Sequence, residues 1–134
     1  MRSRYPSAST FSYSFGPGPL TPAIKGLLIA NVVMFVVVSL GGDTGRTVRD
    51  WLGLQPSALV SDFRLWQPLT YMFLHGGLSH ILFNMLSLWM FGVELERMWG
   101  TRYFLRYYFV AGVGAAMTTI AVSLLPLPIF ADVY

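Results

Sequence analysis

One uncharged stretch, residues 65–93, constrains the fold of this sequence more than any other feature. About 20 mostly apolar residues are enough for a helix that crosses a bilayer, so residues 71–92 are expected to span a membrane. The stretch also contains four polar side chains, which are His75, His80, Asn84 and Ser87. A polar group without a partner in hydrocarbon costs several kcal/mol, so these side chains are expected to face the interior of a helical bundle.

Composition supports a membrane protein. Hydrophobic residues make up 54% of the 134 residues and charged residues 11%, with a mean hydropathy of +0.57. These values lie outside ordinary soluble composition. The nine basic residues form no cluster, so no nucleic-acid partner is expected. The absence of cysteine excludes a disulfide framework, a thiolate metal site and a cysteine nucleophile.

The first span is expected at about residues 22–40. Thr21 and Pro22 are typical of a helix start, and the Gly-Gly pair that follows Leu40 is typical of a helix end. At 1.5 Å per residue this helix would be about 28 Å long, close to the thickness of the hydrocarbon layer. Residues 1–19 mix Ser, Tyr, Phe, Gly and Pro without a period and are expected to form a disordered tail.

Two further spans are expected at about residues 69–92 and 104–125. A short charged turn would join them, with Gly100 as a helix end. Small residues four apart in the third span would let another helix approach closely, and they are Ala111 with Ala115 and Gly112 with Ala116. The sequence thus predicts an all-α membrane protein with three transmembrane helices, in which residues 20–134 form one domain.

The connection at residues 43–66 carries six charged residues yet is also rich in apolar residues. Val48, Trp51 and Leu52 follow helical spacing, which predicts short amphipathic helices with tryptophan anchors at the membrane interface. A linker that happens to be apolar is the alternative. Loops of this length are uncommon and tend to be functional.

Lysine and arginine are unevenly distributed between the two sides of the predicted membrane. Six lie on one side, and they are Arg2, Arg4, Lys25, Arg97, Arg102 and Arg106. Three lie on the other, and they are Arg46, Arg49 and Arg64. Because cytoplasmic loops are enriched in basic residues, we expect a multi-pass protein of the plasma or inner membrane with its N-terminus in the cytosol.

His80 and Asn84 are the candidate catalytic residues. They lie one helical turn apart and can both donate an N–H toward a common point, as stabilisation of a developing oxyanion requires. Hydrogen bonding to neighbouring helices is the alternative and the more common role of buried polar groups. His75 and His80 would be about 140° apart on one helix and have no acidic or cysteine companion, so neither a metal nor a cofactor is expected.

Several motifs in the second half of the sequence resemble the rhomboid intramembrane serine proteases. They are LWQPLTYMFLHGG at residues 65–77, HILFNM at 80–85, Phe91-Gly92, and Glu96-x-x-x-Gly100-x-x-x-Phe104. The resemblance covers residues 20–134 and implies the first half of a six-span core, with a first external loop that lies partly in the membrane. It also implies that His80 and Asn84 help to stabilise the oxyanion of an acyl-transfer intermediate.

The sequence departs from the rhomboid pattern in two places. Gln67 stands where the family often has arginine, with Arg64 nearby. The family's nucleophile lies in a Gly-x-Ser-Gly motif on the fourth span and its base is a histidine on the sixth, and neither is among these 134 residues. Ser79 cannot replace the nucleophile, since adjacent helical residues point about 100° apart and Ser79 would not reach the imidazole of His80.

Two functional hypotheses follow. In the first, the chain is the N-terminal part of a rhomboid-type endopeptidase that cleaves transmembrane substrates, and the chain alone is inactive. In the second, it is a non-catalytic membrane protein that binds single-span client proteins through the polar side of the second span and the small residues of the third. The partners expected are the lipid bilayer and a transmembrane substrate or client.

Overall fold

The computed structural model describes residues 16–125. Within this range the chain is helical and contains no strand. In chain order, the elements are α1 (Pro22–Leu40), α2 (Gly42–Leu52), α3 (Pro56–Ser61), α4 (Gln67–Thr70), the 3-10 turn η1 (Tyr71–Phe73), α5 (Leu78–Ser87), the π-helical segment η2 (Leu88–Gly92), α6 (Val93–Trp99) and α7 (Thr101–Ser123). The predicted all-α class is therefore correct.

Three helices are long and apolar enough to cross a membrane: Pro22–Leu40, Leu78–Trp99 and Thr101–Ser123. The first coincides with its predicted bounds, with Thr21 before it and a proline in its first turn. Residues 1–15 of the predicted N-terminal tail lie outside the described part of the chain. Residues 126–134, at the C-terminal end, also lie outside it. Residues 17 and 19 are described, and their carbonyl oxygens accept hydrogen bonds from Arg97.

The second span differs from the predicted 69–92 at both ends. It begins only at Leu78, because the preceding residues form separate short turns and Gly77 is fully extended (φ 177°, ψ 173°). It continues through η2 and α6 to Trp99, so the charged residues expected in a turn belong to the helix. Gly100, with φ 78°, ends the helix as predicted, in a backbone conformation that favours glycine.

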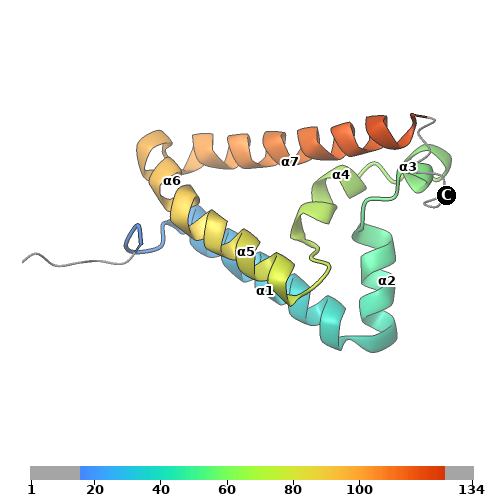
Figure 1. The fold of residues 1–134 in the computed structure, drawn as a ribbon, viewed down its shortest axis with the longest axis horizontal. Coiled ribbons are helices and arrows are strands. Elements are labelled where there is room, and N and C mark those ends of the chain that lie inside the picture. The colour runs from blue at the N-terminus through green and yellow to red at the C-terminus, as the bar shows by residue number, and fades with distance from the viewer. Residues whose placement is uncertain (1–15, 126–134) are drawn as a thin grey trace, which may run out of the picture.

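α1 runs alongside the second span, while α7 meets both at one end and diverges from them toward its C-terminal end (Figure 1). α1 contacts α5, η2, α6 and α7, and the short segments α4 and η1 lie in the space between the diverging helices. The core at the closed end consists of Ala23, Ile24, Leu27, Val93 and Phe104. This arrangement leaves a cavity between α1, η1, α5 and α7, which is the candidate functional site.

Glu96 holds the closed end together. Its side chain is buried, at 4% exposure, and accepts backbone N–H groups of Ala23 and Ile24, both at 3.1 Å. These N–H groups lie in the first turn of α1, where no helical partner exists. Glu96 also accepts the hydroxyls of Thr21 and Thr101, the latter at 2.6 Å. One carboxylate on α6 therefore caps α1 and fixes the start of α7.

The same contacts explain the spacing Glu96-x-x-x-Gly100-x-x-x-Phe104. Gly100 allows the sharp turn that brings Thr101 to the carboxylate, and Phe104, only 2% exposed, follows one turn later in the core. Each of the three positions thus serves the same junction between α1, α6 and α7.

Gly112 is the point of closest approach on α7. The side chain of Met72 lies where a Cβ at Gly112 would be, with Cε 2.1 Å from that position, and the Tyr71 hydroxyl donates to the Gly112 carbonyl at 2.7 Å. The small residues of the third span therefore do allow close approach, but the segment that approaches Gly112 is η1 rather than another spanning helix.

The connection between α1 and α4 contains two short helices, α2 and α3, in the region where amphipathic pieces were expected. Gln67 is fully buried and anchors this connection, since its Oε1 accepts the N–H of Gln55 at 3.0 Å and its Nε2 lies 3.4 Å from the Trp51 carbonyl. Trp51 stacks on Trp66, with ring centroids 5.2 Å apart. Arg64 lies over the Trp51 ring at 5.9 Å, so Gln67 and Arg64 together stabilise the loop.

Candidate functional site

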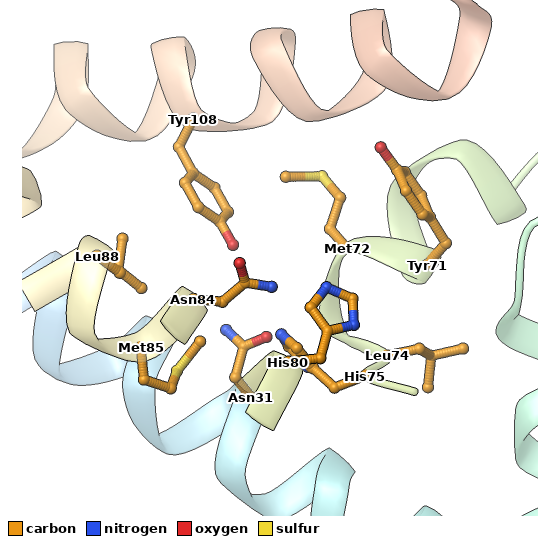
Figure 2. Close-up of a pocket in the computed structure, with 10 residues that line it drawn as sticks. All are labelled: Asn31, Tyr71, Met72, Leu74, His75, His80, Asn84, Met85, Leu88 and Tyr108. Carbon is orange, nitrogen blue, oxygen red and sulfur yellow. The ribbon is translucent and has the colours of Figure 1, made fainter. Parts of the chain in front are cut away.

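A cavity of about 410 Å³ lies between α1, η1, α5 and α7. Its polar lining comes from five segments of the chain and consists of Asn31, Tyr71, His75, His80, Asn84 and Tyr108. Figure 2 shows Asn31, Asn84 and Tyr108 close to one another, with the Tyr108 ring entering from α7, whereas the Tyr71 hydroxyl points toward α7. The cavity therefore joins the predicted catalytic pair to polar residues from other helices.

His80 and Asn84 both line this cavity from α5. The Nδ1 atom of His80 accepts a long hydrogen bond of 3.4 Å from the Gly76 backbone N–H, which places the imidazole proton on Nε2. The Asn84 side chain forms no hydrogen bond within residues 16–125. One imidazole N–H and one amide NH₂ therefore face the cavity without partners from the described chain.

His75 lies beside His80 rather than on the far side of a helix. Because α5 begins only at Leu78, the expected separation of about 140° around one helix axis does not arise, and the two rings meet edge to face with centroids 5.1 Å apart. Burial, followed by the nearby His80, lowers the pKa of the His75 imidazole, while a backbone hydrogen bond with Phe73 acts in the opposite direction. Burial and the neighbouring His80 therefore favour the neutral form of the His75 imidazole.

Asn31 is a member of the site that the sequence analysis did not single out. It is fully buried in the middle of α1, where its Nδ2 donates to the Leu27 carbonyl at 2.7 Å, while its Oδ1 has no partner in the described chain. The rule that drew attention to the second span, that a polar residue inside a span faces the bundle interior, applies equally to Asn31. Tyr108 gave no such signal, because it is one of several tyrosines in α7.

Comparison with known proteins identifies the family. A family model described as the Rhomboid domain matches residues 62–127, which contain the second and third spanning helices. The chain belongs to the rhomboid family. A rhomboid protease of Bacillus subtilis, GluP, is 33% identical over 107 residues, which are 78% of this chain and 21% of that protein. The rhomboid proteases GlpG of Salmonella paratyphi A and Salmonella typhi are each 38% identical over 84 residues, or 63% of this chain and 28% of theirs.

The chain spans between about a fifth and a third of the length of these rhomboid relatives. No solved structure matches it significantly. Family membership together with three helices that can cross a bilayer establishes an integral membrane protein of the rhomboid class. Which reaction these residues support depends on the cavity.

Proposed function

We propose that this chain forms the oxyanion-binding part of an intramembrane serine endopeptidase that cleaves transmembrane substrates. The observation that carries the proposal is that His80 and Asn84 line one cavity and direct free N–H donors into it. Donors aimed at the position where charge develops stabilise the transition state without needing to reorganise. The names of the relatives, rhomboid proteases, support the same reaction class.

In acyl transfer, a serine hydroxyl attacks the scissile carbonyl while a base removes its proton, and negative charge builds on the carbonyl oxygen. His80 Nε2–H and Asn84 Nδ2–H would donate to that oxygen. Because negative charge develops on that oxygen only during the reaction, both donors stabilise the tetrahedral intermediate more than the neutral substrate. The resemblance assigns the nucleophile and the base to a Gly-x-Ser-Gly motif and a later histidine, which these 134 residues do not contain.

The alternative role for the pair, hydrogen bonding that holds helices together, predicts partners on neighbouring helices. Within residues 16–125 no neighbouring helix supplies one, although α1 and α7 both line the same cavity. This favours a pair kept free for a substrate. Binding of a single-span client without cleavage uses the same cavity and is separated from proteolysis by the next experiment.

Residues 1–134 alone are expected to hydrolyse no peptide bond, because oxyanion donors act only on the attack that a nucleophile provides. Co-expression with the remaining spans of a rhomboid protease, which carry the serine and the later histidine, is expected to restore cleavage of a labelled transmembrane substrate. The control is the same complementing fragment with its serine replaced by alanine. Substrate that binds without being cut in the complemented complex would favour the client-binding alternative.

The orientation proposed from the basic residues places α2 and α3 outside the cell and the α6–α7 junction in the cytosol. Because the chain lacks cysteine, the single substitutions Ser57→Cys in α3 and Met98→Cys in α6 report each side cleanly. Both positions are exposed. A membrane-impermeant maleimide added to intact cells is expected to label Ser57→Cys and to label Met98→Cys only after permeabilisation. The reverse pattern would invert the topology.

A further inference from the structure

A row of aromatic rings lies on the outer surface at the junction of α6 and α7. Trp99 contacts Tyr103 and Tyr107 edge to face, with ring centroids 5.6 Å and 5.2 Å apart. Two adjoining hollows of about 390 Å³ and 270 Å³ share both tyrosines, and Arg106 and Val110 line the second. We call these five residues the aromatic groove. The ring contacts hold its walls in place before any ligand arrives.

The two arginines on this part of α7, Arg102 and Arg106, have no partner in the described part of the chain. At the same end of the molecule, Arg97 is fully engaged, with Glu94 at 3.0 Å and with two backbone carbonyls. Arg102 and Arg106 form no hydrogen bond, ion pair or ring contact within residues 16–125. None of the described residues that line either hollow is acidic. The groove therefore presents uncompensated positive charge.

The position of Arg106 along α7 indicates the kind of ligand. Arg106 follows the first residue of α7 by five positions, about 7.5 Å along the helix. This depth corresponds to the boundary between headgroups and hydrocarbon, where tryptophan and tyrosine are enriched and where lipid phosphates lie within reach. A guanidinium at this depth gains charge-assisted hydrogen bonds from a phosphate. Val110, 72% exposed one turn deeper, offers an apolar surface for an acyl chain.

We propose that the aromatic groove binds an anionic phospholipid of the leaflet that α7 enters. The lipid phosphate accepts hydrogen bonds from Arg106 and from the hydroxyls of Tyr103 and Tyr107, and Arg102 adds to the positive potential that attracts the anionic headgroup. The first acyl chain lies along Val110. Charge complementarity selects an anionic headgroup over a zwitterionic one, since a choline group would meet two unpaired guanidinium groups.

The test measures lipid binding to the purified full chain by native mass spectrometry in detergent. Phosphatidylglycerol and phosphatidylcholine with the same acyl chains are compared, and glycerol 3-phosphate serves as the headgroup without chains. Phosphatidylglycerol is expected to bind at least fivefold more tightly than phosphatidylcholine, since each arginine near an anionic headgroup contributes about that factor. Arg106→Gln is expected to lose about fivefold, while Arg46→Gln, an arginine on α2, changes nothing.

A second variant, Tyr103→Leu with Tyr107→Leu, leaves both arginines in place and is expected to weaken both lipids. Equal binding of the two lipids would overturn the proposal and leave an ordinary aromatic belt. Unchanged phosphatidylglycerol affinity in Arg106→Gln would also overturn it, because the groove would not be the site. Glycerol 3-phosphate that binds as tightly as the lipid would show a soluble-phosphate site instead.

Discussion

Replacing Glu96 with alanine is expected to lower the free energy of unfolding by about 3–5 kcal/mol, because several buried donors lose the carboxylate that accepts their hydrogen bonds. The substitution leaves two backbone N–H groups at the start of α1 without an acceptor. It also leaves the hydroxyls of Thr21 and Thr101 unpaired beside an apolar core. Each stranded buried donor costs about 1–3 kcal/mol, although relaxation of the helix ends recovers part of the sum.

Unfolding of the purified chain in mixed detergent, followed by circular dichroism, measures this loss. Glu94→Ala is the matched control, because Glu94 lies on the same helix but its side chain is 55% exposed and, among residues 16–125, pairs only with Arg97. Its removal is expected to cost less than about 1 kcal/mol. Glu96→Gln keeps one acceptor oxygen and is expected to fall between the two. If Glu96→Ala and Glu94→Ala proved equally mild, the junction would owe its stability to the apolar core alone.

The first span could be predicted to the residue, because its ends are set by local signals. Pro22 starts the helix with no N–H to satisfy, and the glycines after Leu40 end it, so the bounds could be predicted without knowing of the distant cap from Glu96. The second span could not be predicted this way. Hydropathy does not distinguish a helix from the separate turns at residues 67–73, whose backbone is held by distant groups.

Two such distant contacts are the Thr70 hydroxyl on the Leu52 carbonyl, at 2.7 Å, and the Tyr71 hydroxyl on the Gly112 carbonyl. Their partners lie 18 and 41 residues away in the chain, where no periodicity could connect them. The role of Glu96 was hidden for the same reason. Its spacing from Gly100 and Phe104 could be read in the sequence, but the α1 backbone that it caps lies 72 residues away or more.

The residues of the candidate site could likewise be predicted only in part. His80 and Asn84 could be paired from helical spacing alone, since both lie within α5. Asn31 could have been predicted by applying to the first span the rule used for the second, that a polar residue inside a span faces the interior of the bundle. His75 was misplaced because its position relative to His80 depends on where α5 begins, and the glycines before Leu78 delay that start. What periodicity cannot supply is the relation between residues on different segments.

His80→Ala and Asn84→Ala are each expected to lower kcat about 10²–10³-fold in the protease complex restored by the complementing spans. This corresponds to about 3–4 kcal/mol, the usual loss for one oxyanion donor. KM is expected to change little, because the hydrogen bonds strengthen only as charge develops on the carbonyl oxygen. The double variant is expected to lose less than the product of the single losses, since donors to one oxygen act as a unit.

Stability measured in the same detergent separates catalysis from structure. A purely structural pair would cost about 1–3 kcal/mol of stability on removal, with activity falling only in proportion to folded protein. Ser79→Ala is the matched control, because Ser79 is an exposed neighbour on α5 that does not line the cavity, and it is expected to leave kcat unchanged. If activity per folded molecule in both single variants stayed within about twofold of the parent, far from the loss of an oxyanion donor, the catalytic assignment would be wrong. His80 and Asn84 would then hold helices together, and the free donors in the cavity would be sites for helices that complete the bundle.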